Sequence, residues 1–143
     1  MQISDIIRNL IDANMSVRLC VWNKSNPSPM NGDRLWLSSA EFCVFGKKPN
    51  ATFNQHCKSS VWNYPTELSK IHPTQKPVRL IEYLISSSSN SGDTVFDPCF
   101  GSGTTAIASM LLRRKFIGCE LDPQFFSDAK ERIENQIVTR PLF

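Results

Sequence analysis

The chain has 143 residues, 41% of them hydrophobic, and a net charge of +3. This length suits one compact domain, and the hydrophobic share excludes a compositionally disordered protein. No apolar run approaches the roughly 18 residues that a membrane-spanning helix needs, and no cationic start precedes an apolar stretch. We therefore expect neither a membrane span nor a targeting segment.

The cysteine content indicates reduced thiols. The five cysteines are an odd number, and none forms a Cys-x-x-Cys pair. Such usage is typical of a cytoplasmic protein rather than a disulfide scaffold. His56 and Cys57 lack the spaced partners of a zinc site, so we expect no metal site.

The N-terminal part predicts a helix and two strands. Apolar residues recur at helical spacing over residues 3–11, and residues 17–22 are typical of a strand. A loop rich in Pro and Asn follows over residues 23–33, and residues 40–45 predict a second strand. Residues 49–77 hold few periodic apolar positions, so we expect a long exposed loop, the kind of segment in which binding residues concentrate.

The C-terminal part predicts a parallel α/β unit. A helix begins near Pro77 and ends in the Ser-rich segment 86–92. A short strand over residues 94–97 leads through a glycine-containing loop into a helix near residues 104–112. Another strand and a helix capped by Asp122 follow, and this alternation of strands and helices is typical of an α/β fold. We expect a single domain spanning residues 1–143.

The glycine-containing loop has the pattern of a nucleotide-binding turn. Residues 101–106 fit G-x-G-x-x-G/A, and Glu120 follows Gly101 by 19 residues at the end of the next predicted strand. Glycines let the backbone approach a ligand, and a carboxylate at that place can accept both hydroxyls of a ribose. A dinucleotide and S-adenosylmethionine both fit this pattern. Asp97 favours S-adenosylmethionine, because a carboxylate repels a pyrophosphate and attracts the ammonium of methionine.

Three segments carry a resemblance to a known family. Residues 97–105 (Asp-Pro-Cys-Phe-Gly-Ser-Gly-Thr-Thr) resemble the cofactor motif of bacterial and phage DNA N6-adenine/N4-cytosine methyltransferases. Residues 71–77 resemble the second cofactor-contacting motif of that family, and residues 116–123 resemble its ribose-binding strand. The resemblance implies a partial Rossmann-like S-adenosylmethionine-dependent methyltransferase fold, with a mostly parallel sheet flanked by helices.

The resemblance also implies roles for single residues. Asp97 would hold the methionine ammonium, and Glu120 would bind the ribose. The backbone of residues 101–103, with Thr104 and Thr105, would hold the carboxylate end of the cofactor.

A second group of residues would line the methionine side of the cofactor. His72, Thr74 and Lys76 are its members, with Lys76 near the carboxylate. The alternative for these positions is a capped turn with a solvated lysine. The complete predicted cofactor site comprises His72, Thr74, Lys76, Asp97, Pro98, Cys99, Phe100, Gly101, Ser102, Gly103, Thr104, Thr105, Glu120, Leu121 and Asp122.

The N-terminal half resembles the same family less sharply. Residues 21–29 and 39–48 resemble strands that follow the family's catalytic strand. Trp22 and Trp62 within this half are either core residues or neighbours of the target base.

The catalytic tetrapeptide of the family is not found. In the permuted subclass, an Asp/Asn-Pro-Pro-Tyr/Phe motif precedes these segments and grips the extruded base. Residues 26–29 (Asn-Pro-Ser-Pro) lack the adjacent prolines and the aromatic residue, and residues 97–100 belong to the cofactor loop. We therefore predict no catalytic residue, and a domain that begins downstream of the catalytic strand. A second polypeptide could supply that strand, its two neighbours could pair directly, or the gene could be degraded.

Double-stranded DNA is the partner that the resemblance implies. Lys47, Lys48, Lys58 and Lys70 lie in or near the predicted loop and could contact phosphates. The alternative is a solvated loop without a partner.

Three functions stay open at this point. The chain is the C-terminal portion of a DNA amino-methyltransferase, a non-catalytic module that binds cofactor or DNA, or a fragment of a nicotinamide-dependent oxidoreductase.

Overall fold

The structure is a computed structural model and describes residues 2–30, 32–68 and 71–139. It divides into two compact units, Met1–Thr66 and Glu67–Phe143. By sequence, the first unit holds seven Lys and Arg against four Asp and Glu, whereas the second holds nine of each. The first unit therefore carries the whole excess of positive charge. Within the described ranges, no helix is long and apolar enough to cross a membrane.

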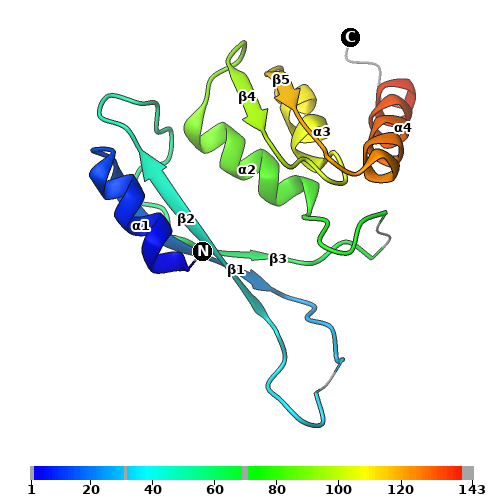
Figure 1. The fold of residues 1–143 in the computed structure, drawn as a ribbon, viewed down its shortest axis with the longest axis horizontal. Coiled ribbons are helices and arrows are strands. Elements are labelled where there is room, and N and C mark those ends of the chain that lie inside the picture. Colours follow the sequence, from blue (N-terminus) through cyan, green and yellow to red (C-terminus); the bar gives the residue numbers. More distant parts are fainter. Residues whose placement is uncertain (1, 31, 69–70, 140–143) are drawn as a thin grey trace. The chain divides into compact units, whose positions relative to one another are not determined.

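The first unit is a helix and a three-stranded sheet (Figure 1). Its elements are α1 (Ile3–Asp12), β1 (Ser16–Lys24), β2 (Ala40–Lys47) and β3 (Val61–Tyr64). The strand order is β2-β1-β3, with β1 antiparallel to β2 and parallel to β3. The predicted helix and the first two strands are confirmed within two residues at each end.

Strand β3 lies inside the segment that the sequence predicted to be a loop. Its four residues lie between Ser60 and Pro65 and are too few to show a strand alternation. The strand is stabilised by parallel pairing with β1, in which Val61–Tyr64 lies beside Val21–Lys24. The loop prediction for residues 49–77 therefore needs this correction.

Trp22 belongs to the core of the first unit. Its side chain is buried, and its indole Nε1 donates a hydrogen bond to the carbonyl oxygen of Tyr64 at 2.8 Å. Cys20 is buried on the same strand, and Trp62 is half-buried. Of the two roles considered for Trp22, the structure supports that of a core residue.

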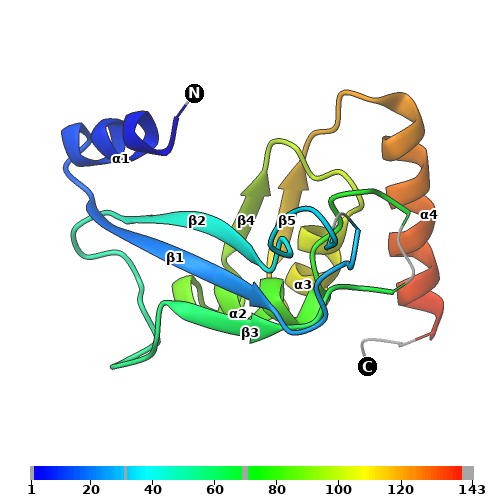
Figure 2. The same cartoon turned by 90° about the horizontal axis from the view of Figure 1, so that it is seen from below.

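The second unit contains two parallel strands and three helices. Its elements are α2 (Val78–Ser88), β4 (Thr94–Asp97), α3 (Thr104–Leu111), β5 (Lys115–Gly118) and α4 (Pro123–Thr139). Figure 2 shows β4 and β5 side by side, in the parallel register that pairs Asp97 with Gly118. The parallel α/β unit predicted from the sequence is confirmed.

Small and aliphatic side chains form the core of this unit. Leu80 on α2 and Ile107 and Ala108 on α3 are buried, as is Ala129 on α4. Asp122 caps α4, because its Oδ1 accepts hydrogen bonds from two backbone N–H groups of the first turn. The cap predicted at Asp122 is confirmed.

One face of the β4–β5 pair is open. Phe96 and Ile117 are cross-strand partners, and their side chains are 61% and 58% exposed. Strand β4 pairs only with β5 in the part of the chain that the structure describes, and β1 belongs to the other sheet. The second unit presents an unpaired strand edge next to an exposed apolar face.

Candidate cofactor-binding site

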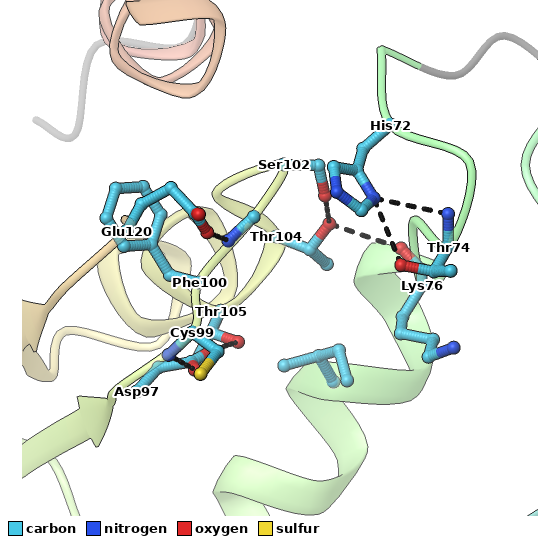
Figure 3. A pocket seen from close by; sticks show the side chains of 12 residues that line it. His72, Thr74, Lys76, Asp97, Cys99, Phe100, Ser102, Thr104, Thr105 and Glu120 are labelled. Atoms are coloured by element: carbon cyan, nitrogen blue, oxygen red, sulfur yellow. Dashed lines mark hydrogen bonds between the residues drawn. The ribbon is translucent and has the colours of Figure 1, made fainter. Parts of the chain in front are cut away.

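A cavity of about 340 Å³ opens at the carboxyl ends of β4 and β5 in the second unit (Figure 3). Ligands of open α/β sheets bind at this end of the strands. Of the fifteen predicted cofactor residues, Pro98, Gly103, Leu121 and Asp122 lie outside the lining, and the other eleven line it. Ile81 of α2 lines it as well. Ile81 lies within the helix predicted after Pro77, and an apolar residue in a helix has no sequence signal that distinguishes a cavity wall from a core.

Asp97 is held in place at the end of β4. Its Oδ2 accepts a hydrogen bond from Thr105 Oγ1 at 2.6 Å, and its Oδ1 accepts one from the backbone N–H of Cys99 at 3.1 Å. Each carboxylate oxygen keeps a further lone pair for a ligand. Thr105 therefore orients the carboxylate, so its hydroxyl acts on a ligand through Asp97.

Glu120 joins the loops that follow β4 and β5. Its Oε2 accepts a hydrogen bond from the N–H of Gly101 at 2.9 Å, and its Oε1 accepts from the N–H groups of Leu121 and Asp122. The hydrogen bonds from the N–H groups of Asp122, Gly101 and Leu121, in that order of effect, hold the pKa of the Glu120 carboxyl below its usual value. Glu120 is therefore an anion fixed at the rim of the cavity.

Gly103 is the point where the glycine loop meets α4. Its φ of +73° lies in the left-handed region, and a Cβ added there would lie 3.1 Å from Cδ1 of Ile133 and 3.3 Å from Cβ of Ala129. Only glycine satisfies both the backbone conformation and the close approach of α4. Gly103 therefore does not line the cavity, but it allows α4 to pack closely against the loop that does.

His72 lies against the glycine loop from the 71–77 segment. Its Nδ1 accepts a hydrogen bond from the backbone N–H of Thr74 at 3.2 Å, which places the proton of a neutral ring on Nε2. The ring lies within 3.9 Å of the position that a Cβ on Gly101 would take, and its centroid lies 4.2 Å from that of Phe125. The structure therefore brings two of the three motifs into contact.

Thr104 connects the same two segments through a buried hydroxyl. Its Oγ1 donates to the carbonyl oxygen of Lys76 at 3.2 Å. Since a hydroxyl has one proton, Ser102 Oγ must be the donor in the 3.1 Å hydrogen bond between the two side chains. Both side chains are buried, so the hydrogen bonds of the Thr104 hydroxyl are made within the protein.

The five cysteines are free thiols. Burial raises the pKa of the Cys20 and Cys43 thiols, and at Cys20 the neighbouring Cys43 adds to this effect. Cys99 is exposed and lines the cavity. Within the described residues, no group of three or more His, Cys, Asp or Glu side chains could hold a metal ion.

The predicted DNA-contacting lysines lie in the first unit, apart from Lys70, which is outside the described residues. Lys47 ends β2 opposite Ser16, the first residue of β1. Lys48 and Lys58 are exposed. Their contact with DNA stays a prediction.

The cavity combines chemical groups of three kinds. Asp97 offers a carboxylate for a cation, and Glu120 offers one for hydroxyl groups. Phe100 and Ile81 contribute apolar surface to the lining. This donor set fits a ligand that has an ammonium group, a sugar diol and an apolar part, which is the composition of S-adenosylmethionine.

Comparison with known proteins agrees with this geometry. Residues 3–131 match the DNA methylase family N6_N4_Mtase. Type II methyltransferase M2.MboI of Moraxella bovis is 32% identical over 133 residues, which cover 81% of this chain and 49% of that protein. Type II methyltransferase M.HinfI of Haemophilus influenzae is 33% identical over 135 residues, 79% of this chain and 38% of that one. The chain thus spans half or less of the length of these two relatives.

Solved structures are similar over nearly the whole chain. The crystal structure of M1.HpyAVI in complex with SAM has a TM-score of 0.77 and 36% identity, covering 92% of this chain and 69% of that one. The PvuII DNA methyltransferase, which is cytosine-N4-specific, has a TM-score of 0.70 at 18% identity, covering 92% of this chain and 59% of that one, and shows the shared fold. The match over residues 3–131 spans both units, and this chain belongs to the N6/N4 DNA methylase family.

Proposed function

We propose that the chain binds S-adenosylmethionine in this cavity, as the cofactor half of an enzyme that methylates an exocyclic amine of adenine (N6) or cytosine (N4) in double-stranded DNA. The observation that carries the proposal is the meeting of Asp97, Glu120 and His72 around one cavity at the carboxyl ends of two parallel strands. The M1.HpyAVI structure, solved as a SAM complex, supports the choice of ligand.

The residues of this chain bind and orient the cofactor. Asp97, oriented by Thr105, attracts the ammonium of the methionine part. Glu120 accepts a ribose hydroxyl through the remaining lone pair of its Oε2, while its hydrogen bond with the Gly101 N–H holds the two loops together. When bound, the cofactor supplies a methyl group activated by a sulfonium centre.

We further propose that a second polypeptide supplies the catalytic Asp/Asn-Pro-Pro-Tyr/Phe strand. The tetrapeptide is absent from these 143 residues, and within the described residues the edge of β4 opposite β5 is unpaired, so an added strand could pair there. The added segment would align the amine of the extruded base with the methyl group.

DNA would be held by the first unit. That unit carries the excess of positive charge, and Lys47, Lys48 and Lys58 could contact phosphates, together with Lys70 of the second unit. We place the protein in the cytoplasm, where its five cysteines stay reduced.

A non-catalytic role is the second candidate. It is favoured by one observation, the absence of the tetrapeptide from the 143 residues. In that case the chain holds the cofactor or DNA without transferring a methyl group.

Calorimetry with S-adenosylhomocysteine tests cofactor binding. We expect saturable binding by the purified chain and binding at least about tenfold weaker for Asp97→Asn, because the substitution removes one charge-assisted hydrogen bond to the ligand. Asp93→Asn is the matched control, since Asp93 caps a turn before β4 and does not line the cavity. Absence of heat at millimolar ligand from folded protein would refute the proposal.

Methyl transfer separates the two candidates. The chain is incubated with labelled S-adenosylmethionine and mixed-sequence DNA, alone and with a polypeptide that carries the catalytic segment of a relative. We expect label in DNA only from the mixture. Turnover by the chain alone would contradict the need for a second polypeptide, and cofactor binding without turnover in the mixture would favour the non-catalytic role.

A further inference from the structure

Arg132 of α4 donates hydrogen bonds to the glycine loop. Its Nη1 donates to the carbonyl oxygen of Ser102 at 2.7 Å and to Oγ1 of Thr104 at 3.0 Å. The side chain is half-buried, and Arg132 does not line the cofactor cavity. It therefore acts on that cavity only through the residues it holds.

Arg132 fills the hydrogen-bonding capacity of the Thr104 hydroxyl. Thr104 Oγ1 accepts from Arg132 and from Ser102 Oγ, and it donates its one proton to the carbonyl oxygen of Lys76. A hydroxyl has two lone pairs and one proton, so the group is saturated. Because Arg132 occupies one acceptor site, the proton is directed toward Lys76.

The Lys76 carbonyl belongs to a segment that is tied together by its own hydrogen bonds. The backbone N–H of Gln75 donates to the His72 carbonyl at 3.1 Å, and buried Gln75 accepts the N–H of Ile71 through its Oε1. Fixing this segment at Lys76 therefore also fixes His72 against Gly101. Arg132 is thus connected to the 71–77 segment through the Thr104 hydroxyl.

A negative charge accompanies the cation. Burial lowers the pKa of the Arg132 guanidinium, and the carboxylate of Glu67 opposes this shift. The Oε1 of Glu67 also accepts the N–H of Val78 at the start of α2. An arginine side chain stays protonated in proteins, and hydrogen bonds from a charged donor are stronger than neutral ones.

We propose that Arg132 is a positioning residue of the cofactor site, which holds the 71–77 segment against the glycine loop through Thr104 and so forms the methionine side of the cavity before the ligand binds. This inference rests on the proposed function. It separates two roles: Asp97 and Glu120 contact the cofactor, whereas Arg132 and Thr104 hold the wall that the amino-acid part of the cofactor meets.

Two ligands that differ only in that part provide the test. S-adenosylhomocysteine carries the amino-acid part, and 5′-methylthioadenosine lacks it but keeps the adenosine and the thioether. Affinities of both are measured by calorimetry for the wild type, Arg132→Met and Thr104→Val. We expect each variant to lose about tenfold in affinity for S-adenosylhomocysteine, because each breaks the connection between Arg132 and the Lys76 carbonyl, and less than about twofold for 5′-methylthioadenosine.

Three further variants sharpen the result. The double variant should bind no more weakly than the weaker single variant, because both act through one hydroxyl. Arg132→Lys should recover part of the loss, since it keeps a cationic donor. Lys130→Met, on an exposed position of the same helix, should bind like the wild type.

The outcomes are distinct. An equal fall in affinity for both ligands would show general loosening of the second unit and overturn the proposal, as would wild-type affinities in Thr104→Val and Arg132→Met. If Arg132→Met fails to fold by circular dichroism, the near-isosteric Thr104→Val decides alone. If the wild type binds neither ligand, the proposed function fails first, and that result is distinguishable from a failure of Arg132 alone.

Discussion

Single residues determine the geometry of the cofactor cavity, and Gly103 is the one with the least freedom to change. Gly103→Ala should lower the free energy of unfolding by about 1–3 kcal/mol, because alanine meets a left-handed φ and the side chains of α4 at once. Urea denaturation followed by circular dichroism measures the loss. Gly92→Ala is the control, since Gly92 has a φ of +89° but open space around it, and it should cost less. An equal cost would exclude crowding by α4.

Glu120 gives the site a dependence on acidity. Its pKa in the folded chain lies below the usual 4.5, so the stabilisation it provides is complete above pH 4.5 and is lost as the pH falls through the lowered value. Glu120→Gln should therefore melt below the wild type at pH 7, and the difference in Tm should shrink as the pH falls below 4.5. Differential scanning fluorimetry across pH 3 to 7 would show it. A difference that stays constant over this range would contradict the assignment.

Cys99 reports occupancy of the cavity. It is exposed and lines the cavity, whereas Cys57 is exposed in the other unit. We expect S-adenosylhomocysteine to slow maleimide labelling of Cys99 and to leave labelling of Cys57 unchanged, as measured by peptide mass spectrometry. Equal rates at Cys99 with and without bound ligand would place the ligand elsewhere.

Among the elements, the β4–β5 pair stands out because its outer face is apolar and exposed. Phe96→Thr should reduce binding of the dye ANS, which reports exposed apolar surface, with little change in Tm, because surface substitutions typically change stability by about 0.5 kcal/mol or less. Val95→Thr, on the other, half-buried face, should lower Tm instead. Unchanged dye binding in Phe96→Thr would show that this face is covered in solution.

Most elements could be predicted from the sequence because each carries its own periodic pattern. Strand β4, the glycine loop and α3 were predicted within one residue, and so was the start of α4 at Asp122. Strand β3 could not be, since its stability comes from pairing with β1, 40 residues earlier.

The cofactor site could be predicted where its residues follow one another in short sequence motifs. Eleven predicted residues line the cavity because the 71–77 segment, the loop after β4 and Glu120 meet in the fold. Arg132 was not foreseen, because an arginine on a polar helix face has no sequence signal that separates a solvated cation from one that holds a distant loop. Nor could the sequence show that the Thr104 hydroxyl is used within the protein, because its hydrogen-bond acceptor, the Lys76 carbonyl, lies 28 residues earlier.

At the scale of the whole molecule, the charge is divided unevenly between the two units. If DNA is held by the first unit, Lys47→Gln/Lys48→Gln should lower affinity for all sequences alike. The slope of log affinity against log salt should also fall, by about one for each lysine–phosphate pair that the substitutions remove. Fluorescence anisotropy with a labelled duplex at low and at moderate salt measures both. Lys115→Gln/Lys130→Gln removes two charges from the second unit and should leave the slope unchanged. The reverse pattern would move the DNA-binding surface to the second unit.

The hydrogen bonds between Arg132 and the glycine loop also have a thermodynamic consequence for α4. Coupling between two sites is reciprocal: if α4 improves ligand affinity by holding the loop, the ligand must stabilise α4 by the same free energy. Local opening of this helix near Arg132 should therefore become rarer when the cavity is filled. The helix would act as a sensor of occupancy, although Arg132 itself does not line the cavity.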